Sequence, residues 1–161
     1  MGDHTLIVMR HAKAAELPGG PDVDRPLRPR GRRNSAAAGH WLASHGYRPD
    51  LVLCSAAERT MQTWEHVSAE LGGSAEIRAE RGLYQADAED VAEFIRAVPE
   101  PAATVLYIGH NPAAAELAAV LTGAEPPFPT AAIAVVRLAG SWAGLAPGAC
   151  DLVASWVPRG S

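Results

Sequence analysis

The chain has 161 residues, of which 48% are apolar and 20% are charged, and its formal net charge is −4. These values are typical of a globular domain with a core of its own. The negative net charge excludes broad nucleic-acid binding, which needs a basic surface. A local basic cluster at Arg25, Arg28, Arg30, Arg32 and Arg33 is equally consistent with a solvated helix face and with a recognition patch.

The sequence contains neither a membrane-spanning segment nor a cysteine pattern that binds metal. No apolar run approaches the ~20 residues that cross a bilayer, and the N-terminus lacks a signal-peptide pattern. Cys54 and Cys150 each lie in an apolar run, which predicts buried, reduced thiols. We therefore expect one cytoplasmic domain over residues 1–157, followed by a tail at 158–161 that resembles part of an added protease site.

The first half of the chain predicts two buried strands, each followed by a helix. The apolar run 5–10 is typical of a strand buried on both faces. Residues 30–46 carry apolar positions at helical spacing, and Gly46 suits the position just after a helix. Residues 50–55 predict the next strand, and Ser55 is the expected N-cap of a helix that two glycines end.

A weaker strand and a well-marked helix follow. Residues 75–80 predict a short strand. Asp87 and Asp90 have the spacing of a capping box and predict a helix that continues to Val98.

The last third predicts a strand, a helix and a hairpin. Residues 103–109 are strongly apolar, and Asn111 is the expected cap of the next helix, with Pro112 at its first position. Segments 132–138 and 149–157 flank a glycine-rich turn and predict an antiparallel hairpin. Strands that alternate with helices predict an α/β fold, here a three-layer α/β/α sandwich with a mainly parallel central sheet.

Potentially reactive side chains follow three of the predicted strands. Arg10 and His11 end the first, Arg59 lies one turn beyond the second, and His110 follows the strand at 103–109. Taken singly, each has an ordinary role as a loop histidine, a salt-bridging arginine or a turn residue. The carboxyl ends of parallel strands share one edge of a sheet, so we expect all four to converge.

The four side chains are chemically complementary. Two guanidinium groups cradle a phosphoryl dianion through paired hydrogen bonds, and helix N-termini add backbone donors. An imidazole beside that cradle is a nucleophile for phosphorus. The residues therefore predict phosphoryl-transfer chemistry.

The motifs around these residues resemble those of the histidine phosphatase superfamily, also called the phosphoglycerate mutase-like family. They are "LIVMRHAKA" (6–14), "SAAERTMQT" (55–63) and "IGHNP" (108–112). The segments "DRPLRPRGRRNSAAAGHWL" (24–42) and "FPTAAIAVVRL" (128–138) resemble its small SixA-like branch. That branch lacks the insertion that covers the site in the mutases.

The resemblance implies a role for each matching position. His11 is expected to be the nucleophile, with Arg10 and Arg59 on the phosphoryl oxygens and His110 stabilising charge, in a site that uses no metal and no cofactor. A fixed acceptor on the second ring nitrogen should keep His11 in the attacking tautomer. The substrate-binding set adds three residues, of which the last two also form turns and caps: Arg25, Ser55 and Asn111.

Two positions depart from the family pattern. Ala12 stands where the family has glycine after Arg-His, which the SixA-like branch accepts. The glutamate that serves as proton donor has no counterpart, because Tyr84 follows Leu83 at that place. Asp22, Asp24 and Glu80 are the candidates for a donor, and the absence of one is the further alternative.

A missing acid favours a substrate whose leaving group needs little protonation. Phosphohistidine releases an imidazole, whereas a phosphate ester releases an alkoxide that needs a general acid. We therefore expect a monomeric phosphohydrolase with a phosphohistidine enzyme intermediate, acting on phosphohistidine-bearing proteins. The alternatives are a phosphomonoesterase for small nucleotide or sugar phosphates, and a non-catalytic module that binds phosphoproteins.

Overall fold

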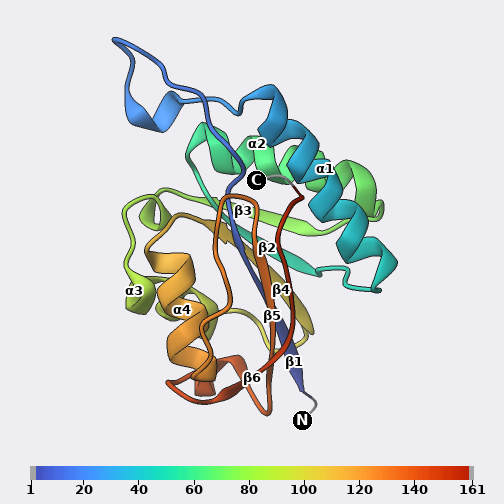
Figure 1. Ribbon diagram of the computed structural model, residues 1–161. Helices are drawn as coiled ribbons and strands as arrows, with labels where there is room; N and C mark the ends of the chain where they lie inside the picture. Colours follow the sequence, from blue (N-terminus) through green and yellow to red (C-terminus); the bar gives the residue numbers. More distant parts are fainter. Residues whose placement is uncertain (1–2, 160–161) are drawn as a thin grey trace.

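The computed structural model describes residues 3–159 and contains one mixed sheet flanked by helices (Figure 1). The strands are β1 (His4–Arg10), β2 (Leu51–Ser55), β3 (Glu76–Glu80), β4 (Thr104–Gly109), β5 (Ile133–Leu138) and β6 (Cys150–Trp156). The α-helices are α1 (Pro29–Ser44), α2 (Glu58–Leu71), α3 (Ala88–Arg96) and α4 (Ala113–Thr122). Single turns of 3₁₀ helix are η1 (Asp22–Asp24), η2 (Arg81–Leu83) and η3 (Trp142–Gly144).

The strand order across the sheet is β3-β2-β4-β1-β5-β6. The first four strands of that order are parallel, while β5 runs antiparallel to β1 and β6 antiparallel to β5. The predicted mainly parallel sheet and antiparallel C-terminal hairpin are therefore confirmed. Because β1 and β4 are central neighbours in register from Thr5 to Arg10, the residues that follow them emerge side by side.

Helices cover both faces of the sheet and make the three predicted layers. Figure 1 shows α1 and α2 on one face and α3 and α4 on the other. The apolar run of β1 serves both layers, because Leu6 and Val8 pack in the core on the α3/α4 side while Ile7 and Met9 pack on the α1/α2 side. Side chains that alternate between two buried faces explain why this strand has no polar alternation.

Two predicted N-cap positions are wrong by one or two residues, although the Asn111 side chain does accept an N–H of the first turn of α4. The second helix begins at Glu58 with Ala57 as N-cap, so Ser55 remains in β2. The fourth helix begins at Ala113 with Pro112 as N-cap. In both cases the chain turns for one or two residues before the helix starts, which leaves the predicted cap outside it.

Other boundaries follow the prediction closely. Gly46 follows α1 with a φ of 76°, a left-handed conformation that glycine adopts without strain. Asp87 and Asp90 form the predicted capping box at the start of α3, because each side chain accepts the backbone N–H of the other. Of the predicted tail at 158–161, residues 160–161 lie outside the described residues, as do residues 1–2 at the other end.

The two cysteines are free and buried, as predicted. Burial raises the pKa of Cys54 to about 12 and that of Cys150 to about 11, so both are protonated thiols at neutral pH. Within residues 3–159, none of the helices has the length and apolar character that crossing a membrane requires.

Candidate functional site

His11 follows β1 directly and is held on both sides by backbone hydrogen bonds. Its N–H donates to the carbonyl of Gly109 at the end of β4 (2.9 Å), and its carbonyl accepts from the N–H of Ala131 (2.9 Å). Ala131 has a φ of 66°, a left-handed conformation that costs a non-glycine residue about 1–2 kcal/mol. The fold thus accepts local strain where it fixes the predicted nucleophile.

The imidazole of His11 has a defined tautomer. Its Nδ1 lies 2.8 Å from the carbonyl oxygen of Ala12, and because that oxygen can only accept, Nδ1 carries the proton and Nε2 keeps its lone pair. The residue as a whole is 8% exposed. Burial, reinforced by the positive charges nearby, lowers the pKa of His11 to about 3, so the neutral ring with a free Nε2 is the resting form.

Ala12 is fully buried and is tied to helix α2. Its N–H donates to the hydroxyl of Thr63 (3.0 Å), and that hydroxyl donates to the carbonyl of Arg59 (2.7 Å). Gln62 of the same motif accepts the N–H of Leu27 with its side-chain oxygen (2.8 Å). The Gln-Thr pair therefore anchors the segments before and after the loop that separates β1 from α1.

Arg10 and Arg59 approach His11 from different elements. Arg10 ends β1 and donates from one terminal nitrogen to the carbonyl of Phe128 (3.2 Å), and burial lowers the pKa of its guanidinium. Arg59 lies in the first turn of α2 and is 7% exposed. The Nε atoms of both arginines are buried and have no hydrogen-bond partner in the described part of the chain. Buried guanidinium donors of this kind suit an oxyanion that brings several acceptors.

His110 faces His11 from the end of β4. Their ring centroids lie 5.2 Å apart, and His110 Nε2 lies 2.8 Å from the hydroxyl of Ser55. Burial, with the positive charges of Arg59 and Arg10, lowers the pKa of His110 to about 4. The predicted convergence is therefore what the structure has, because Arg10, His11 and Arg59 line one cavity and His110 lies beside His11.

A carboxylate and a phenol complete the surroundings of Arg59. The guanidinium donates to the carboxylate of Asp22 (3.0 Å) and to its backbone carbonyl (2.9 Å). The hydroxyl of Tyr84 donates to the same carboxylate, and the Tyr84 ring meets His110 edge-on at 5.6 Å between centroids. Hydrogen bonds from Tyr84, Arg25 and Arg59 hold the pKa of Asp22 well below its ordinary range. Asp22 is therefore a carboxylate at neutral pH.

Of the three candidate proton donors, Asp22 alone contacts the site residues in the described structure. Asp24 is exposed, and the contact of Glu80 at this end of the sheet is a backbone hydrogen bond to Ala56. Tyr84, which stands where the family has a glutamate, contacts Asp22 and His110 without having been predicted to do so. Its position after Leu83, where the family places its acid, was the signal that could have identified it.

The three further residues predicted to bind substrate are placed differently. Arg25 lines the cavity with the nucleophile, but its guanidinium is engaged by Ala15, Asp22 and Glu16. Ser55 is fully buried beneath His110. Asn111 donates to the carbonyl of Phe128 and accepts from the N–H of Ala115, so its side chain shapes the turn before α4.

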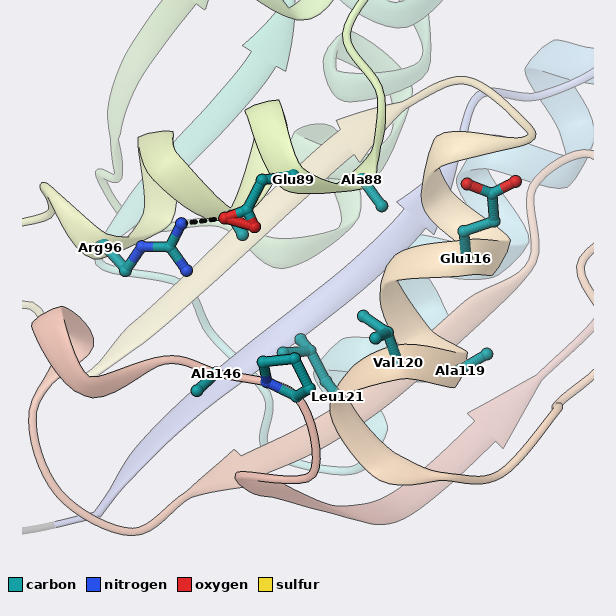
Figure 2. A pocket seen from close by; sticks show the side chains of 10 residues that line it. Ala88, Glu89, Arg96, Glu116, Ala119, Val120, Leu121 and Ala146 are labelled. Atoms are coloured by element: carbon teal, nitrogen blue, oxygen red, sulfur yellow. Dashed lines mark hydrogen bonds and ion pairs between the residues drawn. The ribbon is translucent and has the colours of Figure 1, made fainter.

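His11 opens into a cavity of about 230 Å³ whose walls are mostly cationic. Its lining residues are Arg10, His11, Lys13, Ala14, Glu16, Arg25, Arg28, Arg59 and Thr130. A larger cavity of about 520 Å³ lies between α3, α4 and the Ala146–Pro147 turn, and Figure 2 shows the ion pair of Glu89 with Arg96 on one wall. None of the predicted catalytic side chains lines that second cavity.

The arrangement combines an anion-binding cradle with a nitrogen nucleophile. Two buried guanidiniums offer fixed positive charge to a phosphoryl group, and His11 offers an unprotonated nitrogen beside them. Among the described residues, no three His, Cys, Asp or Glu side chains are grouped so that they could hold a metal ion. The guanidinium groups of Arg10 and Arg59 can supply positive charge that a phosphoryl transfer uses.

Comparisons with known proteins agree with this chemistry. The model of the histidine phosphatase superfamily (branch 1) matches residues 6–100. The uncharacterized protein Rv1276c of Mycobacterium tuberculosis is 41% identical, over 94% of this chain and 100% of its own length.

Two solved structures share both the fold and detectable sequence similarity. A candidate phosphohistidine phosphatase SixA from Nakamurella multipartitia is 35% identical, with a TM-score of 0.87 over 99% of this chain and 98% of its own. The protein histidine phosphatase SixA in complex with tungstate is 30% identical, with a TM-score of 0.82 over 96% of this chain and 97% of its own.

Proposed function

Because this chain belongs to the histidine phosphatase superfamily, we propose that it is a phosphohydrolase that forms a phosphohistidine intermediate on His11. The observation that carries the proposal is the tautomer of that ring, with Nδ1–H held by the Ala12 carbonyl and Nε2 free. Arg10 and Arg59 line the same cavity. A nucleophile has no purpose in a site that only binds phosphate, which weighs against a non-catalytic binding module.

In the first step the phosphoryl group is held between Arg10 and Arg59. The lone pair of His11 Nε2 forms a bond to phosphorus while the bond from phosphorus to the leaving group breaks. For a phosphohistidine substrate whose second ring nitrogen carries a proton, the leaving group is a neutral imidazole, which departs with the bonding electron pair and needs no further proton. The guanidiniums are fixed before the reaction, so they stabilise the charge that develops on the phosphoryl oxygens without reorganising.

In the second step water attacks phosphorus and the bond to His11 Nε2 breaks. The products are inorganic phosphate and the neutral imidazole of His11, still oriented by the Ala12 carbonyl. His110, held by Ser55, lies across from the reacting nitrogen. Its pKa is lowered by burial and then by Arg59 and Arg10, and a bound phosphoryl dianion offsets those positive charges. We therefore assign His110 to hydrogen bonding with the phosphoryl group.

The proposed substrate class depends on whether an acidic side chain of the site can donate a proton at neutral pH. Asp22, the acidic side chain that reaches Arg59, is held as a carboxylate and has no proton to give at neutral pH. An alkoxide leaving group needs a proton, whereas an imidazole leaves more readily without one. The two SixA structures, at 30% and 35% identity, support the same class. A phosphohistidine-bearing protein is thus the proposed substrate, ahead of small nucleotide or sugar phosphates.

A substrate panel tests this proposal. Matched peptides that carry phosphohistidine or phosphoserine, together with a small alkyl phosphate, are compared by kcat/KM with and without a chelator. We expect at least a hundredfold preference for phosphohistidine, no effect of the chelator, and no turnover by His11→Gln. Comparable turnover of the phosphohistidine peptide and the alkyl phosphate would overturn the substrate class, and full activity of His11→Gln would overturn the mechanism.

We also propose that the enzyme acts as a monomer in the cytoplasm. The observation that supports this location is the pair of free, buried thiols at Cys54 and Cys150, which a reducing compartment preserves. Sedimentation of the purified protein tests the oligomeric state, and a dimer at micromolar concentration would contradict it.

A further inference from the structure

Charge is distributed very unevenly along this chain. Residues 10–33 contain seven Lys or Arg and three Asp or Glu, a net charge of +4 in a protein whose net charge is −4. This segment begins at the nucleophile, forms the projecting loop with η1, and ends in the first turns of α1 (Figure 1). A concentration of one sign of charge beside a site attracts ligands of the opposite sign.

Five cations of this segment form what we call the cationic surface: Lys13, Arg28, Arg30, Arg32 and Arg33. All are exposed except Arg30, which is half-buried. Within the described residues, none of the five has an ion pair with an acidic side chain. By contrast, Arg25 and Arg96 in the same structure are each paired with two acids.

The start of α1 places these cations where the helix disfavours them. Its first turn contains no acidic residue, and its N-cap is Arg28, whose side chain makes no capping hydrogen bond. A helix N-terminus carries partial positive charge, so cations there are destabilising. Helix α3 of the same protein begins with Glu89 and Asp90 and a complete capping box. The first turns of α2 and α4 also contain an acidic residue, so α1, which adjoins His11, is the α-helix of the described structure that lacks one.

Part of the cationic surface reaches the cavity that His11 lines. Lys13 and Arg28 line that cavity with His11. The carbonyl of Lys13 accepts the N–H of Arg28 (2.9 Å). A Cβ on Gly31 would lie 2.2 Å from the same carbonyl, so a glycine at this position allows α1 to approach the loop so closely. The fold thus packs the first turn of α1 against Lys13, two positions after His11.

We infer that the cationic surface docks an acidic segment of the protein substrate beside the phosphohistidine that enters the cavity. The inference rests on the proposed function, because it gives a substrate-binding role to the surface beside the same site. Unpaired cations at a disfavoured helix position gain stabilisation when carboxylates of a partner approach them. The site therefore selects phosphohistidine in an acidic context over the same group in a neutral one.

Two phosphohistidine peptides of equal length, one flanked by Asp and Glu and one by Ser and Ala, test this inference. We expect kcat/KM to be about five- to tenfold higher for the acidic peptide at low salt, and this preference to fall at 0.5 M salt. The double variant Arg30→Gln/Arg33→Gln should lose most of the preference and keep its turnover of the neutral peptide. Arg137→Gln removes one positive charge from an exposed residue beside Thr5, at the opposite end of β1, and should leave the preference intact.

Binding of the unphosphorylated acidic peptide, followed by fluorescence anisotropy, separates this inference from the proposed function. If neither phosphopeptide is turned over but the acidic peptide binds and the double variant does not bind it, the docking surface stands and the proposed function fails. Equal kcat/KM for the two phosphopeptides would overturn the docking surface alone. Tighter binding of a single-stranded oligonucleotide than of the acidic peptide would also overturn it, because the surface would then select nucleic acid.

Discussion

Asp22 competes with a bound phosphoryl group for Arg59, so its replacement should strengthen oxyanion binding. The carboxylate accepts a hydrogen bond from Arg59 at 3.0 Å and a second one from the hydroxyl of Tyr84. A phosphoryl group that binds the same guanidinium has to displace the Asp22 carboxylate or share the guanidinium with it. Asp22→Asn keeps the shape of the side chain and removes the charge.

The expected magnitude follows from the exposure of the pair. The side chain of Arg59 is 8% exposed, but that of Asp22 is 51% exposed, so solvent screens the interaction. Pairs of this kind contribute about 0.5–1 kcal/mol. Asp22→Asn should therefore lower the Kd for inorganic phosphate by about two- to fivefold.

Isothermal titration with inorganic phosphate measures this effect, and two further variants control it. Asp24→Asn removes the same charge from an exposed neighbour in η1 and should leave the Kd unchanged. Tyr84→Phe removes a hydrogen bond to Asp22 without changing the charge, and it should also lower the Kd. Unchanged or weaker phosphate binding by Asp22→Asn would refute the reasoning, because it would mean that Asp22 orients Arg59 for the anion.

Three further predictions concern the remaining parts of the site. Arg10→Ala and Arg59→Ala should each lower kcat/KM by about a hundred- to a thousandfold, as expected when one preorganised donor is lost. Unimpaired turnover by a folded variant would show that the replaced arginine does not bind the phosphoryl group. Burial lowers the pKa of His11 to about 3. Its ring should therefore remain neutral and protonated on Nδ1 as the pH falls from 8 to 5. An NMR signal of the His11 imidazolium at pH 6 would contradict this. Ala12→Val should destabilise the protein by about 1–3 kcal/mol in thermal unfolding, because Ala12 is fully buried, and an unchanged Tm would contradict the close packing.

The convergence of the catalytic residues could be predicted from the sequence because it depends on sheet topology alone. Uninterrupted apolar runs identify buried parallel strands, and the carboxyl ends of such strands meet. His11 and His110 come together for this reason, although 99 positions separate them. This convergence can be predicted without any knowledge of side-chain contacts.

The contacts between loops and helix starts could not be predicted in the same way. A serine just before a helix has the chemistry of a cap, yet Ser55 directs its hydroxyl to His110, because the strand continues through that residue. Asp22 lies in a loop without periodicity, so its contact with Arg59 depends on how the loop closes. Ala131 adopts a left-handed φ that its residue type does not indicate.

The central claim is that His11 carries the phosphoryl group during turnover. Mixing the enzyme with a ³²P-labelled phosphohistidine peptide, quenching in acid or in alkali and recovering the protein tests it most directly. We expect a protein-bound phosphate that acid removes and alkali preserves, located on His11 and absent from His11→Gln. Turnover of the peptide without any such phosphate, or with the label on another residue, would contradict it.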